Sequence, residues 1–527
     1  MQLPSSTQVL VAGGGPVGLA AAVELGRRGI ECLVVEPRSV VSHARPRCKT
    51  INVRSMEHLR RWGIADRLRQ RAPLPIAWSQ DIVFCTSLAG RELSRFTGVL
   101  GLVAEGDRFP EPGQQAPQYV LEELLRTVVG ELDGCMLATG ARVTGLDQDA
   151  DEVRVTVTDE AGRQSVVTAD YVVGCDGPRS TVRDQIGSAY VGEHALRPNF
   201  GMVFQAPELW QQVQHGPAVQ YWTINPAAPA LLGPIDRTDI WWMIAFGVER
   251  EVGERTGHQL IQAATGLPID AQILSTDPWT AHMQMVDRIR CGRVFLAGDA
   301  AHLNPPFGGH GLNTGLGDAV DLGWKLAAIL DGWGGPALLD SYEQERRPIH
   351  TQVIDNATAN MSVLSNELLA ANLDDDDTAG ERARADAGAR IQETKTAEFH
   401  ALDLVLDLTL DSSPVIVADE DTSPDGASAG ARLPHTWLEP GVSLYDRLGT
   451  GLTLLALDGE PGSAAAIEQA AKHRGVPITV LDLSGHRLRD RYGADLVLVR
   501  PDQYVAWRGD HAPDDPLTLV DRIRGDR

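Results

Sequence analysis

The chain has 527 residues, and 43% of them are hydrophobic, which is enough for two to four domains with substantial cores. Its 47 Lys and Arg against 71 Asp and Glu give a net charge of −24, which excludes a general nucleic-acid binder because such a protein needs a basic face. No apolar run is long enough to span a membrane, and no basic segment precedes the first apolar stretch. We therefore expect neither a transmembrane helix nor a signal peptide.

The six cysteines are scattered along the chain, with no C-x-x-C pair and none after residue 291. This spacing is typical of free thiols in a reducing compartment and not of a disulfide framework or a zinc site. We therefore predict a cytoplasmic protein without a structural metal.

The N-terminal residues predict a dinucleotide-binding β-α-β unit. Residues 9–12 and 32–35 are apolar strands, residues 19–28 form a helix between them, and the turn at residues 13–18 carries G-x-G-x-x-G. An acidic residue, Glu36, follows the second strand. The two flanking strands and this acid favour dinucleotide binding over an ordinary strand–turn–helix.

Each glycine of this motif has a physical role. Gly13 allows the tight turn, Gly15 lets the backbone approach a pyrophosphate, and Gly18 lets the helix pack closely on the strand. The helix N-terminus offers free N–H groups and the positive end of its dipole to phosphates. Glu36 can accept hydrogen bonds from a ribose.

Three further features follow along the chain. Arg47 lies in a basic loop and is either a solvated cation or a cation folded back on the dinucleotide phosphates. Gln118 opens an amphipathic helix. Residues 171–175 form a buried strand that leads into a turn at Asp176 and Gly177, which is the second motif of the chain after the glycine-rich turn with Glu36.

Residues 188–290 hold five of the eleven tryptophans and several alternating apolar stretches, which predict an antiparallel sheet. Core packing explains each tryptophan taken alone. Taken together, they would make an apolar floor for an aromatic substrate.

A third motif follows this sheet. A buried strand ends in Gly298 and Asp299, and a loop rich in Pro and Gly at residues 303–315 leads into a long helix. A second long helix is predicted from about residue 337 to 369, and we expect Pro348 to kink or break it.

The last hundred residues follow a β-α-β-β-β order, with a helix at 463–474 and strands at 451–457, 477–483, 496–499 and 504–507. This order suggests a thioredoxin-like domain. The segment contains no cysteine, which excludes dithiol redox chemistry there. A polar stretch at residues 418–430 predicts a linker, and the acidic run at residues 374–377 predicts a solvated surface.

The three motifs together resemble the single-component, FAD-dependent aromatic hydroxylases, also called class A flavoprotein monooxygenases. The most specific match is GRVFLAGDAAH at residues 292–302, supported by residues 313–326. Residues 431–435 and 499–508 resemble the C-terminal thioredoxin-like domain of the phenol-hydroxylase and polyketide-hydroxylase branch. The resemblance covers nearly the whole chain.

The resemblance implies an α/β fold with a Rossmann-type, glutathione-reductase-like FAD-binding domain, an inserted antiparallel-sheet substrate domain and a C-terminal thioredoxin-like domain. The FAD-binding domain is expected to be discontinuous, at residues 1–76, 111–187 and 288–400. The expected ranges of the other parts are 77–110 and 188–287 for the substrate domain, 401–429 for a linker, and 430–527 for the C-terminal domain.

The resemblance also implies the chemistry. NAD(P)H reduces FAD, O2 adds to give a C4a-hydroperoxyflavin, and one oxygen passes to a phenolic or related (hetero)aromatic substrate. Baeyer–Villiger or epoxidising oxygenation on the same fold is an alternative, and so is a non-catalytic, FAD-holding protein. The expected partners are a small aromatic substrate and O2, with no nucleic acid and no membrane, and the C-terminal domain implies a homo-oligomer.

The cofactor-binding residues that the resemblance implies are Gly13, Gly15, Pro16, Val17, Gly18, Glu36, Arg47, Gln118, Asp176, Gly298, Asp299, Pro306, Gly309, Gly311, Leu312 and Asn313. Among them, Gly311 and Leu312 would turn their N–H groups, at a helix N-terminus, towards the negative charge of the reduced flavin ring.

One position departs from the family pattern, because His310 stands where Gln is common. This residue could fill space, contact the substrate or add a titratable group near the ring. It is therefore the candidate catalytic residue. The general base for the substrate phenol stays open, because it could be His310 or His282, or the substrate could be deprotonated by desolvation.

Overall fold

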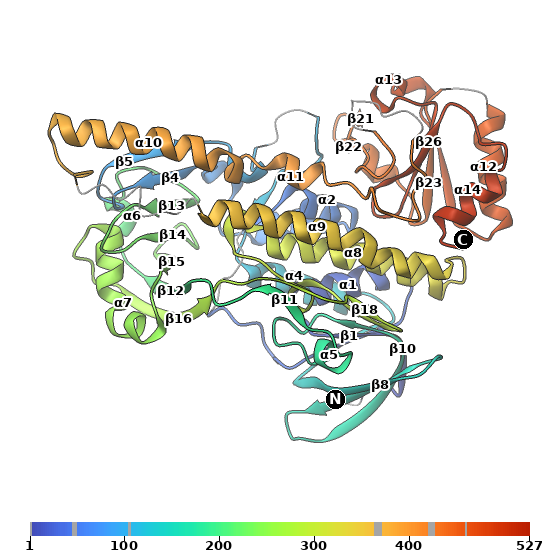
Figure 1. The fold of residues 1–527 in the computed structure, drawn as a ribbon, viewed down its shortest axis with the longest axis horizontal. Helices are drawn as coiled ribbons and strands as arrows, with labels where there is room; N and C mark the ends of the chain where they lie inside the picture. Colours follow the sequence, from blue (N-terminus) through green and yellow to red (C-terminus); the bar gives the residue numbers. More distant parts are fainter. Residues whose placement is uncertain are drawn as a thin grey trace.

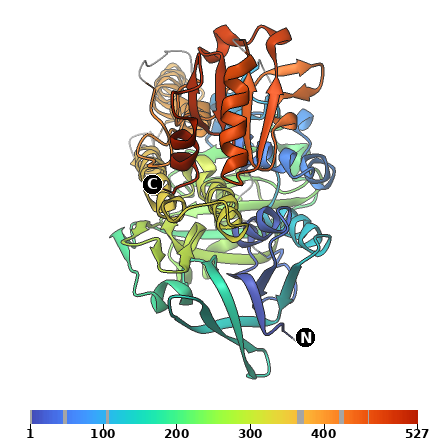
Figure 2. The ribbon, with the colours of Figure 1, turned by 90° about the vertical axis from the view of Figure 1, so that its right-hand side faces the viewer.

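The computed structural model describes residues 3–44, 50–103, 107–362, 372–419, 427–458 and 461–526. A central sheet, a second sheet and a C-terminal domain surround two long helices, α8 (His310–Leu330) and α9 (Pro336–Ser362) (Figure 1). Figure 2 shows the C-terminal domain above these helices and the central sheet below them. Within the described residues, no helix is both long and apolar enough to cross a membrane.

The central sheet has the strand order β18-β19-β10-β1-β2-β7, and neighbouring strands from β19 to β7 run parallel. Its strands are continuous buried apolar runs, as in other parallel sheets that are covered on both faces. The bounds are β1 (Ser6–Ala12), α1 (Pro16–Gly26), β2 (Cys32–Glu36), α4 (Gln118–Gly130), β7 (Cys135–Thr139), β8 (Ala141–Gln148), β9 (Val153–Asp159), β10 (Gln164–Gly174), β18 (Arg290–Cys291) and β19 (Val294–Leu296).

The second sheet has seven strands in the order β16-β12-β15-β14-β13-β4-β5, and α7 (Arg250–Thr265) packs on β12 and β16. Side chains alternate between its two faces. Trp241 packs on the α7 side, whereas Trp242 and Phe246 belong to clusters on the other side. The strand bounds are β4 (Ile82–Cys85), β5 (Glu92–Phe96), β12 (Pro198–Gln205), β13 (Gln220–Thr223), β14 (Ala230–Pro234), β15 (Ile240–Phe246) and β16 (Gln272–Thr280).

Helix α10 (Thr378–Phe399) packs against β5 of the second sheet (Figure 1). Its Ile391 and Phe399 are buried with Phe84 and Phe96 of that sheet. The sequence-based range places these residues in the FAD-binding domain instead. An amphipathic helix shows in its sequence that one face is buried, but not which sheet buries it.

Helix α9 continues through Pro348, where the sequence predicts a kink or a break. Proline has no N–H, so the carbonyl of Gln344 loses its partner within the helix. The hydroxyl of Ser412 donates to this carbonyl at 2.9 Å. A hydrogen bond from outside the helix therefore replaces the one that proline removes.

The C-terminal domain has a four-stranded sheet in the order β24-β23-β25-β26, with only β23 and β24 parallel. Its elements are β23 (Leu452–Ala456), α12 (Pro461–His473), β24 (Ile478–Asp482), β25 (Leu496–Val499), β26 (Val505–Gly509) and α14 (Pro516–Ile523). The preceding segment, predicted as a linker, includes α11 (Leu402–Leu406), and Leu410 and Ile416 pack against α9.

The five cysteines within the described residues are free thiols. Cys48 and the predicted phosphate-binding residue Arg47 lie outside the described residues.

Candidate active site

The glycine-rich turn has the geometry of a phosphate-binding turn. Gly13 has a φ of +103°, and a Cβ there would lie 2.3 Å from the carbonyl oxygen of Cys175. A Cβ on Gly18 would lie 2.0 Å from the oxygen of Gly13, so the helix starts too close to the turn for any side chain. A Cβ on Gly15 would meet no protein atom within 4 Å. The turn is therefore packed on two sides and open at Gly15.

Glu36 is 3% exposed and folds back on this turn. Its Oε2 accepts from the N–H of Gly14 at 2.7 Å, and its Oε1 accepts from the N–H and Nε of Arg38 at 3.0 and 2.6 Å. A carboxylate oxygen has two lone pairs, so Oε2 can accept one further hydrogen bond, as from a ribose hydroxyl. Arg38 also pairs with Glu122 at 3.0 Å, a bridge that sequence patterns do not reveal.

The three sequence motifs meet at one edge of the central sheet. Ala12, Gly174 and Leu296 end the neighbouring strands β1, β10 and β19 in register. Ligands bind at the carboxyl ends of such strands. A Cβ on Gly298 would lie 3.0 Å from Val17, so the first and third motifs are in contact. Asp299 is exposed beside them.

Asp176 has a structural part in the second motif. Its carboxylate accepts from the hydroxyl of Ser180 and, at 3.1 Å, from the N–H of Val182, at the start of α5 (Thr181–Gln185). Burial raises the pKa of Asp176. Gln118 is half-buried and is the first residue of α4, as the sequence predicts.

A buried carboxylate, Asp318 of α8, anchors the third motif. It accepts from the N–H of Gly298 at 3.0 Å, Nε2 of His302 at 3.0 Å, Nε of Arg346 at 2.7 Å and Nε2 of His350 at 2.8 Å. These contacts hold the pKa of Asp318 well below its usual range, and burial lowers that of His350 to about 4. Both carboxylate oxygens are already engaged, so the two histidines and Asp318 form a hydrogen-bonded anchor for the motif.

The loop before α8 ends in two left-handed glycines. Gly308 and Gly309 have φ values of +75° and +69° and follow Pro306. Gly309 is the N-cap of α8 and has no side chain to cap it. The N–H groups of the first turn, including those of Gly311 and Leu312, therefore remain available to a negatively charged ligand.

Asn313 connects α8 to β3 (Thr50–Ile51) and α2 (Val53–Arg61). Its Nδ2 donates to the carbonyls of Thr50 at 2.9 Å and Gly309 at 2.7 Å. Its Oδ1 accepts from the N–H of Asn52 at 3.0 Å and the hydroxyl of Ser55 at 2.7 Å. The Asn313 amide thus fixes the loop in place.

His310 is 6% exposed, and burial lowers its pKa to about 4, so the imidazole is neutral at pH 7. Its side chain is hydrogen-bonded to Asn356, and its Nε2 has no partner among the described residues. The other candidate, His282, is half-buried, and its Nδ1 accepts weakly from the N–H of Ala195 at 3.5 Å.

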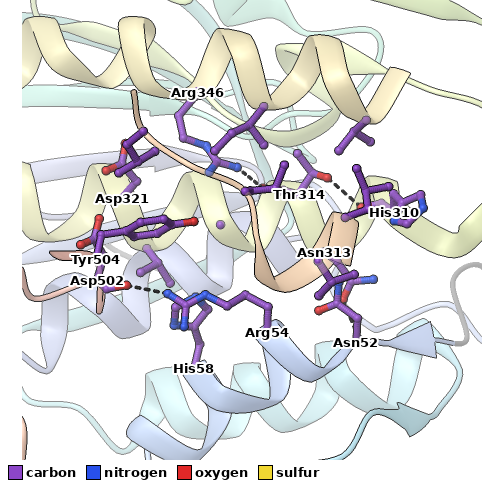
Figure 3. Close-up of a pocket in the computed structure, with 18 residues that line it drawn as sticks. Asn52, Arg54, His58, His310, Asn313, Thr314, Asp321, Arg346, Asp502 and Tyr504 are labelled. Atoms are coloured by element: carbon purple, nitrogen blue, oxygen red, sulfur yellow. Dashed lines mark hydrogen bonds between the residues drawn. The ribbon is translucent and has the colours of Figure 1, made fainter. Parts of the chain in front are cut away.

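A cavity of about 60 Å³ lies behind the start of α8, between α2, α9 and the C-terminal domain. Figure 3 shows His310, Thr314 and Arg346 along one wall and Arg54 and His58 along the other. Tyr504 and Asp502 close one end of this cavity.

An aromatic wall runs from the second sheet to the loop. Trp222 stacks on Phe84 with ring centroids 5.5 Å apart, and lies 5.8 Å from Phe246 and 6.2 Å from Phe307. Phe307 belongs to the loop itself. This wall brings the second sheet to the loop that precedes α8, which sequence spacing alone does not show.

Comparisons with known proteins agree with this geometry. Residues 6–357 match the model of a family described as FAD binding domain, and residues 427–525 match that of aromatic-ring hydroxylase, C-terminal. Tetracenomycin B2 monooxygenase-dioxygenase of Streptomyces olivaceus is 33% identical over 98% of this chain and 97% of its own length. The 2,4-dichlorophenol 6-monooxygenase of Cupriavidus pinatubonensis is 30% identical, with 99% and 97% covered.

Solved structures show the same similarity. The rebeccamycin biosynthetic enzyme RebC with reduced flavin superposes with a TM-score of 0.92 at 35% identity, covering the whole of both chains. The ternary complex of aklavinone-11 hydroxylase with FAD and aklavinone gives a TM-score of 0.83 at 27% identity, again over both whole chains.

Proposed function

Because this chain belongs to the single-component FAD-dependent aromatic hydroxylases, we propose that it uses NAD(P)H and O2 to hydroxylate a phenolic or related polycyclic aromatic compound. The observation that supports this most is the meeting of the three cofactor motifs and the aromatic wall at the loop before α8. The overall reaction turns the substrate, NAD(P)H, H⁺ and O2 into the hydroxylated product, NAD(P)⁺ and water.

The residues have distinct tasks towards the cofactor. The open side of Gly15 and the first turn of α1 would receive the pyrophosphate, and Oε2 of Glu36 the adenosine ribose. Asp299 would accept from a ribityl hydroxyl, whereas Arg47 and Gln118 would contact the phosphate and ribityl parts. When bound, FAD supplies the hydride acceptance and the O2 activation, so the protein provides no nucleophile. The uncapped N–H groups of Gly311 and Leu312 would stabilise negative charge on the ring.

The substrate would lie between the flavin and the aromatic wall. Trp222, Phe246 and Phe307 form a packed aromatic cluster beside the loop, and we infer that an extended aromatic ring system would pack against this cluster. The neutral His310 is too buried to act as an exposed base, so we infer that the nearby helix N-terminus favours deprotonation of the substrate phenol by stabilising the negative charge that forms.

We infer a thioredoxin-like arrangement for the C-terminal domain. Its parallel β23-α12-β24 unit followed by antiparallel β25 and β26 supports this. Association into a homo-oligomer through this domain is part of the same proposal.

The cofactor proposal is tested by Gly15→Ala with Gly130→Ala as the matched control. Both methyl groups would enter space free of protein, so both variants should fold. Only Gly15 faces the proposed pyrophosphate, and we expect its variant to bind FAD about tenfold more weakly, measured by flavin fluorescence. Equal FAD affinity in the two variants would place the cofactor elsewhere.

The reaction proposal is tested with a panel of simple phenols and polycyclic aromatics. We expect NAD(P)H oxidation to rise with one of them and the product mass to rise by one oxygen. If neither NADH nor NADPH reduces the bound flavin, the hydroxylase proposal fails. A ring-expanded lactone would instead identify a Baeyer–Villiger enzyme.

A further inference from the structure

A buried ion pair of α10 contacts the loop that precedes α8. Lys395 is 0% exposed and Glu398 2%. Nζ of Lys395 lies 2.7 Å from Oε2 of Glu398 and donates at 2.9 Å to the carbonyl of Asn360. Neither residue belongs to a sequence motif, and none of the proposed cofactor contacts uses them.

This pair contacts both the loop and the aromatic wall. Oε1 of Glu398 accepts from the N–H of Gly308 at 3.2 Å. Nζ of Lys395 lies 5.3 Å from the ring centroid of Trp222 and 5.8 Å from that of Phe307, within the range of cation–π attraction. One ion pair therefore joins α10 to the backbone of the loop and to the rings that would face the substrate.

A second set of contacts reaches the same loop from α9. Nδ2 of Asn360 donates to Oδ1 of Asn356 at 2.9 Å, and Asn356 is hydrogen-bonded to His310. A Cβ on Gly308 would lie 2.3 Å from Nε2 of His310, so the imidazole rests against this glycine. The polar contacts thus run from Gly308 through α10 and α9 to His310, whose ring packs against Gly308.

Burying two charges costs free energy, and a buried ion pair often contributes little net stability. What such a pair does is restrict geometry, because each partner must keep its place to avoid an unpaired buried charge. Here the restricted element is the loop at residues 307–309, which sets the start of α8 and the position of Phe307.

We propose that Lys395 and Glu398 are positioning residues that hold the loop at residues 307–309 against the flavin and the aromatic wall. With the loop in place, one oxygen atom of O2 is transferred to the substrate and is not released as H2O2. This inference rests on the proposed function. When the loop is displaced, water enters, and NAD(P)H, H⁺ and O2 give NAD(P)⁺ and H2O2 without hydroxylation. A correctly held loop keeps the site closed and the α8 N–H groups aimed at the ring.

The experiment compares Lys395→Met with Lys325→Met in the FAD-loaded full chain. Lys325 is an equally buried lysine, 2.6 Å from Glu345, but it belongs to the contact between α8, α9 and the C-terminal domain and not to the loop. Both variants should lose stability. We expect only Lys395→Met to bind FAD several-fold more weakly and to release about tenfold more H2O2 per NAD(P)H in the presence of a stimulating aromatic. A change of this size corresponds to the loss of one hydrogen bond to a charged group.

A conservative pair of variants separates positioning from packing. Glu398→Gln keeps an acceptor for Gly308, whereas Glu398→Met does not. Both variants leave Lys395 without its counter-charge, so FAD affinity and H2O2 release should change most in the methionine variant and recover in part in the glutamine variant. The same values for Lys395→Met and Lys325→Met would overturn the proposal. FAD affinity is measured whether or not an aromatic is hydroxylated, so failure of the proposed reaction in the wild type is distinguished from failure of this inference.

Discussion

The two ends of α8 use buried charges in different ways. At its N-terminal end, the Lys395–Glu398 pair reaches the loop through one backbone hydrogen bond. In its C-terminal half, Asp321 and Lys325 belong to a network with Glu345, and the C-terminal domain inserts Arg500 into it. The first arrangement fixes a few loop residues, and the second fixes a whole domain.

The charge balance differs between the two ends. Lys395 and Glu398 balance each other, whereas Lys325 and Arg500 face three carboxylates, those of Asp321, Glu345 and Asp502. The surplus negative charge and burial raise the pKa of Asp321 to about 7, while the two cations lower that of Glu345. The domain contact therefore buries one carboxylate more than it has cations, because each cation pairs with at least two carboxylates.

The largest effect is expected from Arg500→Met, which removes the cation that the C-terminal domain supplies. Glu345 and Asp321 would keep buried charge with one partner fewer. Removing one member of a buried ion pair costs about 3–5 kcal/mol, so the midpoint of urea unfolding followed by circular dichroism should fall clearly.

The matched control is Arg163→Met, whose guanidinium is 78% exposed and pairs only with Asp159 within the described residues. We expect a change below about 0.5 kcal/mol for this surface pair. Equal urea midpoints for the two variants would show that the network does not hold the domain.

The next effect concerns acid stability at the loop end. His310 has a pKa of about 4 in the folded protein against 6.5 as a free side chain. Between these pH values the unfolded chain binds more protons, so this group makes stability fall as the pH drops from 6.5 to 4. His310→Gln should remove up to about 3 kcal/mol of that loss by pH 4.

Urea unfolding at pH 7, 5.5 and 4.5 measures this difference between wild type and variant. His350 titrates in the same window in both proteins, so the difference isolates His310. If wild type and variant showed the same slope of stability against pH, His310 would take up its proton in the folded protein over the same pH range as in the unfolded chain.

An effect of comparable size and opposite sign is expected at the other end. With its pKa raised from 3.8 to about 7, Asp321 binds more protons in the folded state, so this group makes stability fall as the pH rises through that range. Asp321→Asn removes the titration, and its unfolding free energy relative to wild type should increase from pH 4 to pH 7. A relative decrease would contradict the surplus-charge account.

The smallest effect concerns the helix that both ends share as a neighbour. Ser412→Ala leaves the Gln344 carbonyl of α9 without its outside donor at Pro348. The loss of one neutral hydrogen bond should cost about 1 kcal/mol. Thermal unfolding measures it, and no shift would mean that water replaces the hydroxyl.

Local chemistry made part of this structure predictable. The turn at Gly13 to Gly18 needs a left-handed residue at Gly13 and close approach of backbone at Gly18, and only glycine allows both. The glycine spacing in the sequence therefore predicts this turn. The strand before Gly298 is equally visible as a continuous apolar run. The family resemblance, carried by these motifs, is confirmed by the comparisons.

Other expectations needed the tertiary structure for correction or detail. Asn313 is a predicted cofactor residue, yet its amide is fully used by Thr50, Gly309, Asn52 and Ser55. The sequence shows an amide at the start of a helix but not its partners in a segment 261 residues away. Pro348 does not break α9, because Ser412 donates to the carbonyl that proline leaves free. The sequence around Pro348 does not show this donor, which lies 68 residues from that carbonyl.

The sequence by itself therefore determined the cofactor turn, the strand-to-motif junctions and the family. Only the tertiary structure decided that α10 joins the aromatic wall, that Asp318 anchors Gly298, and that Arg500 holds the C-terminal domain to α8 and α9. The first group depends on backbone conformations and periodicities within a few residues. The second depends on charges and hydrogen-bonding groups that could pair with many partners, and only the folded chain selects one.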